Sequence, residues 1–325
     1  MESLTTTVGT TARTAGATRT GAPAVRPDRR PAASTRWAAF AFIAPLIVYL
    51  VVFYAYPLYR NIDLSLHDYT PRAFVQGNAA WVGLKNYSDI VASSTFAKAA
   101  VNTALFVLLS ILFQYTIGLA LAVFFRTSFR LNGVLRGMFL VPWLLPLIVS
   151  GSSWAWMLNS DNGIVNSVIK AFGGSQINWL TSPQWVLWSV IIANIWLGIP
   201  FNLVILYSGL QNIPGELYEA ASLDGANGWQ QFRRITFPLL RPVSAVTILL
   251  GLIYTLKVVD IIWIMTKGGP ADASTTFATW SYRQAFGTGQ PAFSPAASIG
   301  NVLIVIALVF GFVYLYLQRR QEKQS

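Results

Sequence analysis

The stretch AAVNTALFVLLSILFQYTIGLALAVFF, residues 99–125, contains no charged side chain and is apolar at nearly every position. A helix of roughly 20 apolar residues rises about 30 Å and crosses the hydrocarbon core of a bilayer. Because no water is available there to satisfy backbone N–H and C=O groups, such a segment must be helical. The stretch therefore predicts a transmembrane helix and an integral membrane protein.

Five further apolar segments of similar length occur, and Pro142, Pro146 and Pro200 fall within two of them. Proline interrupts the backbone hydrogen-bond ladder, but a span packed against neighbouring helices tolerates it. We therefore expect an all-α integral membrane fold with six transmembrane helices. The other expected spans are residues 37–56, 137–158, 185–210, 243–265 and 298–317.

The segment before the first span, residues 1–36, is rich in Thr, Ala, Pro and Arg and has almost no large apolar side chain. Such a segment cannot bury enough apolar surface to fold, so we expect a disordered tail. Residues 37–320 are expected to form the six-helix transmembrane domain, and residues 321–325 a short C-terminal tail.

The composition excludes several kinds of site. The chain is 54% hydrophobic and 11% charged, whereas soluble domains carry about 25% charged residues. It has no cysteine, one histidine and no G-x-x-x-x-G-K-[ST] phosphate-binding loop. Disulfides, cysteine-ligated metals and an ATPase site of that type are therefore excluded. We expect no catalytic site, metal or bound cofactor, so any ATP and Mg that drive this protein must bind to another chain.

The distribution of Lys and Arg predicts the orientation. With a cytoplasmic N-terminus, the inside segments hold 15 Lys and Arg and the outside loops hold 7. Cytoplasmic loops carry such an excess, so both termini are expected inside. The net charge of +11 follows largely from this topology, and we expect no nucleic-acid partner.

A cytoplasmic loop of distinctive composition lies between the fourth and fifth spans, at about residues 211–242. Pro214 suits the first turn of a helix, and Glu216 and Glu219 favour the positive end of its dipole. Gly225 can adopt the left-handed conformation that ends a helix. A second short helix, at about residues 228–236, is expected to end before Pro238. The pattern predicts a helix–glycine–helix elbow, suited to a groove on a partner protein.

This loop resembles the coupling loop of the membrane subunits of ATP-binding-cassette importers. The usual residue at position 237 is leucine, where this chain has Phe237. The resemblance implies that the loop docks into an ATPase subunit and couples ATP hydrolysis to alternating access. Arg233 and Arg234 either contact that ATPase or serve as positive anchors at the membrane. The coupling residues implied by the motif are Glu219, Ala220, Ala221, Asp224, Gly225, Ala226, Ile235 and Pro238.

Other motifs are similar to the carbohydrate branch of that family, the maltose and glycerol-phosphate type. They are Gly83-Leu84-Lys85-Asn86-Tyr87, Asn102-Thr103, Thr266-Lys267-Gly268-Gly269-Pro270 and Tyr282-Arg283-Gln284-Ala285-Phe286. The resemblance implies a permease subunit in a bacterial plasma (inner) membrane. The implied partners are a second, non-identical permease subunit, two ATPase subunits and an extracytoplasmic solute-binding protein.

The same resemblance implies a solute site on the fourth and fifth spans. An amide such as Asn194 can hydrogen-bond to a sugar, and rings such as Phe201 and Tyr254 can stack on one. Val258 replaces a polar residue of the relatives. Polar residues in spans also serve as contacts between helices, which remains the alternative. The matched positions are Asn194, Gly198, Phe201, Gly251, Tyr254, Thr255 and Val258.

Lys257 and Asp260 are charged residues within the fifth expected span, three residues apart. Charges inside a membrane are costly and indicate a function by default. They either line the solute pathway or form an internal ion pair. Lys257 would suit an anionic solute such as glycerol phosphate.

Two other classes of function remain as alternatives. A membrane-embedded sugar transferase would need clustered carboxylates, which are scattered in this sequence. A secondary transporter would show internal repeats and buried ion ligands, and no clear repeat occurs.

Overall fold

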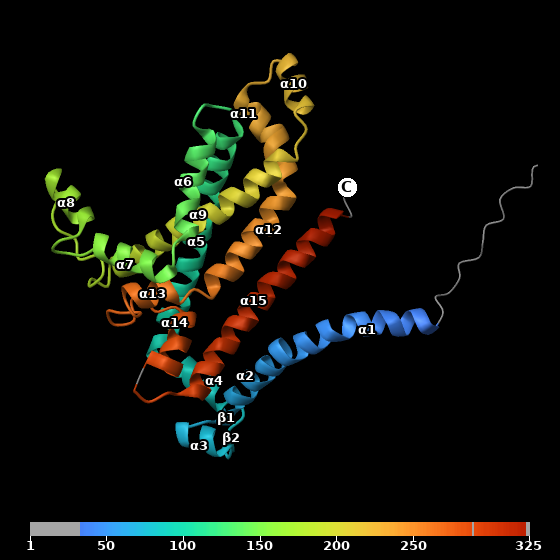
Figure 1. Ribbon diagram of the computed structural model, residues 1–325. Helices are drawn as coiled ribbons and strands as arrows, with labels where there is room; N and C mark the ends of the chain where they lie inside the picture. Colours follow the sequence, from blue (N-terminus) through green and yellow to red (C-terminus); the bar gives the residue numbers. More distant parts are fainter. Residues whose placement is uncertain (1–32, 288, 323–325) are drawn as a thin grey trace, which may run out of the picture. The chain divides into compact units, whose positions relative to one another are not determined.

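The computed structural model describes residues 33–287 and 289–322 (Figure 1). The described residues divide into two compact units, one that ends at Tyr56 and one that begins at Pro57. The first contains α1 (Ala33–Leu50) and a π-helical turn, η1 (Val51–Ala55). Most of the two predicted tails lies outside the described residues.

The second unit is helical apart from a small antiparallel ribbon in which His67 pairs with Trp81. The expectation of an all-α fold is therefore met with this minor exception. Its elements are α2 (Tyr56–Leu66), β1 (His67–Asp68), α3 (Pro71–Gln76), β2 (Ala80–Trp81), α4 (Lys85–Ala92), α5 (Ser94–Arg126), α6 (Asn132–Leu144), α7 (Leu147–Met157), α8 (Ile164–Ala171), α9 (Val186–Gln211), α10 (Glu216–Leu223), α11 (Gly228–Gln231), η2 (Phe232–Thr236), α12 (Phe237–Leu256), α13 (Asp260–Met265), α14 (Phe277–Tyr282), η3 (Arg283–Gly287) and α15 (Phe293–Glu322).

Five helical stretches of the described chain are long and apolar enough to cross a membrane, and one bent pair would make a sixth. The bent pair, α6 and α7, corrects the expectation of a single helix over 137–158, because this segment forms two helices that meet at 97°. Leu145 takes an extended conformation, with φ −75° and ψ 140°. The ring of Pro146 disfavours a helical conformation for the residue before it, so the helix ends there.

The fifth span also departs from expectation. Its helix begins at Gly228 and runs to Leu256, so the second elbow helix does not end before Pro238. The π turn η2 precedes Pro238, which occupies the first turn of α12, where a missing N–H costs little. Beyond Leu256 the helix is broken until Asp260 begins α13.

The core of the second unit lies between α5 and α9, which run side by side (Figure 1). Residues one turn apart form a buried stripe on α5: Ser110, Gln114, Gly118 and Ala122. Small side chains let membrane helices approach closely. At Gly118 the approach is tight, because an added Cβ would lie 2.5 Å from Cβ of Asn202 on α9.

A polar network joins α5 to the segment between α13 and α14. The Asn102 amide on α5 donates to the carbonyl oxygens of Asp272 and Thr275, both at 3.0 Å. The Asp272 carboxylate accepts from Arg283 and Thr95. Burial alone would raise the pKa of the Asp272 carboxyl, but the hydrogen bonds from Arg283, Thr95 and Thr275 and the Arg283 charge outweigh it and lower that pKa.

This network predicts a specific pH dependence of stability. A lowered carboxyl pKa stabilises the fold above the ordinary value of 3.8, and that contribution is lost as the pH falls through the folded pKa. Asp272→Asn should destabilise the protein by about 1–2 kcal/mol at pH 5–7, because it removes a charge-assisted hydrogen bond. Thermal inactivation midpoints measured from pH 7 to pH 3 should show the two proteins converging below about pH 4. A constant difference down to pH 3 would contradict this assignment.

Candidate functional site

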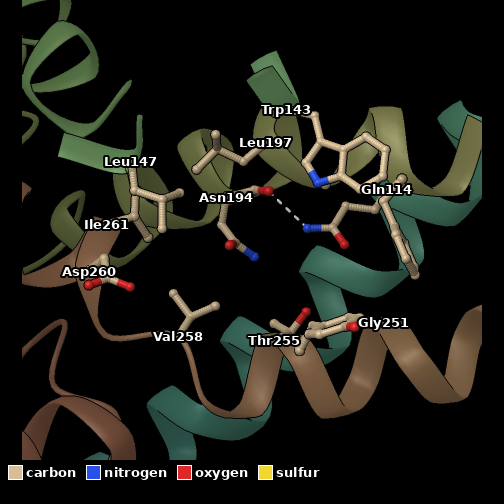
Figure 2. A pocket seen from close by; sticks show the side chains of 13 residues that line it. Gln114, Trp143, Leu147, Asn194, Leu197, Gly251, Thr255, Val258, Asp260 and Ile261 are labelled. Atoms are coloured by element: carbon tan, nitrogen blue, oxygen red, sulfur yellow. Dashed lines mark hydrogen bonds between the residues drawn. The ribbon is translucent and has the colours of Figure 1, made fainter. Parts of the chain in front are cut away.

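A cavity of about 350 Å³ lies where α5, α9 and α12 meet the bend between α6 and α7 (Figure 2). This volume is at the lower end of the range of about 300–1,000 Å³ found for ligand pockets. Its wall is mostly apolar, with a few polar groups. The lining residues are Gln114, Trp143, Leu147, Asn194, Leu197, Gly198, Phe201, Gly251, Tyr254, Thr255, Val258, Asp260 and Ile261.

The polar centre of the cavity is built from two amides. The Gln114 side chain on α5 donates to the backbone carbonyl of Asn194 on α9, at 2.8 Å (Figure 2). This contact requires glycine at 198, because an added Cβ would overlap the Gln114 carboxamide. Asn194 is 5% exposed, and its Nδ2 has no hydrogen-bond partner among the described residues. A buried donor without a partner is costly, so this amide is suited to bind a ligand oxygen.

Aromatic side chains form one wall of the cavity. The Phe201 ring meets Tyr254 edge-on, with centroids 5.6 Å apart, and meets Trp143 at 6.3 Å. Tyr254 is half exposed, so its ring is accessible to a bound molecule. Rings next to hydrogen-bonding groups are the elements that a sugar-like solute requires.

The structure brings together eight of the nine predicted pathway positions, all except Lys257. Their role in transport remains a prediction. The alternative in which Lys257 and Asp260 form an ion pair is wrong: the helix ends between them, and the described residues contain no ion pair of these two. The Lys257 ammonium instead lies 5.0 Å from the Tyr254 ring centroid.

Several lining residues do not appear in the sequence-based prediction, and Gln114 and Trp143 matter most. Gln114 is an amide inside an apolar segment, and such a residue indicates either a function or a contact between helices, so the sequence could have identified it. Trp143 carries no such signal, because its place depends on the bend at Leu145.

A second feature, the elbow, consists of α10, the turn at residues 224–227, α11 and η2. It lies at the end of the unit away from α14 (Figure 1). Gly225 has φ +77°, the left-handed conformation expected of it. Asn227 and Gln230 form a capping box that begins α11.

The elbow presents apolar and acidic side chains outward. Leu223 is 91% exposed and Trp229 is 68% exposed. Glu219 is also exposed, and its carboxylate makes no hydrogen bond or ion pair with the part of the chain that is described. All of the remaining predicted coupling residues are exposed or half-buried: Ala220, Ala221, Asp224, Gly225, Ala226, Ile235 and Pro238.

Tyr218 connects the elbow to the rest of the unit. The Arg126 guanidinium, at the end of α5, lies 3.6 Å from the centroid of the Tyr218 ring. The Tyr218 hydroxyl is 2.9 Å from the Thr236 hydroxyl in η2. This side chain therefore joins α10 both to α5 and to the start of the fifth span. No group of three His, Cys, Asp or Glu side chains within the described ranges could hold a metal ion.

Residues 114–323 match the family described as binding-protein-dependent transport system inner membrane component. The chain belongs to this family, the membrane permease subunits of ATP-binding-cassette transporters.

Its relatives include the trehalose/maltose transport system permease protein MalF of Thermococcus litoralis, 34% identical over 86% of this chain and 93% of that protein. The lactose transport system permease protein LacF of Rhizobium radiobacter is 32% identical over 86% of this chain and 94% of the relative. Among solved structures, a bacterial transporter involved in import of the acidic polysaccharide alginate contains a chain with a TM-score of 0.75 and 25% identity. That match covers 88% of this chain and 96% of the other.

Proposed function

We propose that this protein is a pore-forming subunit of an ATP-driven, binding-protein-dependent importer for a sugar or oligosaccharide. The observation that carries the proposal is the unpartnered Asn194 amide inside a cavity walled by aromatic rings. Relatives named for trehalose, maltose and lactose transport support sugar as the solute class.

In this proposal the elbow is the coupling element and faces the cytoplasm, as do both termini. Its exposed Leu223, Trp229 and Glu219 would contact one of two ATPase subunits, which hold the ATP and Mg. A second, non-identical permease subunit would complete the pathway, and an extracytoplasmic binding protein would deliver the solute. The solved structure of a bacterial alginate transporter in complex with an alginate pentasaccharide-bound periplasmic protein supports this arrangement.

The direct test is to purify a tagged chain from membranes and to identify its partners. We expect an ATPase and a second permease to co-purify, and the reconstituted complex to take up a labelled sugar only with ATP. Uptake by the single chain without ATP would favour a secondary transporter. Sugar transfer to a lipid by the single chain would favour a membrane enzyme. Either result would overturn the proposal.

The contact between Arg126 and Tyr218 predicts a positioning role in coupling. Arg126→Gln removes the cation from the ring face, an interaction of about 0.5–1 kcal/mol. We expect the solute transported per ATP hydrolysed to fall about two- to fivefold, with the amount of assembled complex unchanged. Arg130→Gln is the matched control, because Arg130 is an exposed arginine close to Arg126 in the chain, and its side chain makes no hydrogen bond, ion pair or ring contact with the described residues. Equal ratios in both variants would exclude this role.

A further inference from the structure

The charge of the cavity wall is set by a single residue. Asp260 is the one charged side chain among the residues that line the cavity, and no Lys or Arg is among them. Asp260 is exposed, and its carboxylate makes no hydrogen bond or ion pair with any described residue. The closest cation along the chain, Lys257, lies outside the lining and over the Tyr254 ring. The negative charge therefore has no counter-charge in the wall.

Two hydrogen-bonding groups in the wall are free to bind a ligand, and one needs an acceptor whereas the other needs a donor. Asn194 Nδ2 is a donor without a partner, and an ionised carboxylate such as Asp260 only accepts. Figure 2 shows Asn194 projecting from α9 toward the segment that carries Thr255 and Val258, with Asp260 farther along the same wall.

The chemistry of these groups separates three classes of solute. A sugar hydroxyl both donates and accepts, so it can satisfy the amide and the carboxylate. A carboxylate, sulfonate or phosphate only accepts, and it is repelled by a like charge in a mostly apolar wall. An ammonium group only donates, so it would leave the Asn194 amide without a partner.

We propose that this cavity admits neutral, hydroxyl-rich solutes and rejects anionic sugars, with Asp260 as the residue that determines this specificity. The inference rests on the proposed function as a sugar importer and narrows its solute class. It also disfavours the alternative of an anionic solute such as glycerol phosphate, which Lys257 would suit.

The first experiment measures the charge of the cavity without requiring transport. The chain has no cysteine, so a thiol introduced by Val258→Cys would be its one reactive thiol. In membranes containing the assembled complex, its modification rates by cationic and anionic methanethiosulfonates are compared with and without Asp260→Asn. Asp260→Asn removes one negative charge from the cavity wall close to the introduced thiol. The ratio of the cationic to the anionic modification rate should therefore fall by about tenfold.

Ser175→Cys is the control position, because Ser175 is exposed and does not line the cavity. Its rate ratio should not respond to Asp260→Asn. An unchanged ratio at position 258 would overturn the inference, whatever the complex transports.

The second experiment measures selectivity in the reconstituted complex. Uptake of neutral disaccharides is compared with uptake of the corresponding uronic acids, for the wild type and for Asp260→Asn. The same solute-binding protein serves both complexes, so its own preference cancels in the comparison. The ratio of uronate to neutral uptake should rise at least about fivefold in the variant.

These outcomes separate the two proposals. Absence of ATP-dependent uptake of any sugar by the wild type would count against the proposed function. Uptake of sugars with a uronate-to-neutral ratio that is the same in both complexes would leave that function standing and reject the role of Asp260.

Discussion

Gly118→Leu is expected to destabilise the folded protein strongly. A Cβ at this position would lie 2.5 Å from Asn202 Cβ and 3.1 Å from the backbone nitrogen of Leu203. Neither atom is the end of a flexible side chain, so α5 and α9 would have to separate along their contact. Overpacking of a tight core costs about 1–3 kcal/mol and occasionally more. Because a full leucine is inserted here, we expect the upper end of that range. Thermal inactivation of the purified protein and its yield from membranes measure the effect.

Gly137→Leu is the matched control, since it makes the same substitution in a helix. Gly137 lies in α6 with nothing within 4 Å of an added Cβ, and its surface is exposed. Replacement of glycine within a helix favours the helix by about 0.5–1 kcal/mol, so this variant should be at least as stable as the wild type. Similar losses of stability in both variants would show that the close contact of α5 with α9 is not the cause of the effect.

Gly225→Val is expected to leave the membrane domain intact and to remove coupling. An added Cβ would meet no atom within 4 Å, yet the backbone φ of +77° disfavours a side chain. The left-handed conformation costs about 1–2 kcal/mol for an ordinary residue, and more for a β-branched one. The angle between α10 and α11 would then change, so solute-stimulated ATP hydrolysis by the complex should fall about tenfold or more.

Gly225→Asn separates conformation from side-chain bulk, because asparagine tolerates the left-handed region. This variant should retain most of the stimulated hydrolysis, although it also adds a side chain. If valine and asparagine gave equal losses, bulk at the partner surface would be the cause. If valine had no effect on hydrolysis or uptake, the elbow would not be the coupling element.

The spans and the elbow glycine could be predicted because their signals are local. A segment such as 185–210 is apolar over the length of a bilayer, and the helix runs from Val186 to Gln211. Gly225 has few alternatives to a left-handed turn between two short helical patterns, and it adopts one.

The features that escaped prediction depend on neighbours in space. Pro142 lies inside α6 whereas Pro146 follows its end, and the sequence around them does not distinguish the two. The break after Leu256 falls in an apolar segment whose composition resembles that of an unbroken helix, so Lys257 and Asp260 were expected on one face. Gln114 and Trp143 join the cavity because α5 and α6 pack beside α9.

The outward-facing Leu223 and Trp229 have a consequence for biogenesis. Large apolar side chains held in water are sites of aggregation and of capture by chaperones and proteases. A chain synthesised in excess of the subunit that covers these side chains would expose them until it assembles with that subunit. Its cellular lifetime should therefore depend on the supply of that subunit, which would keep the amounts of the two proteins matched.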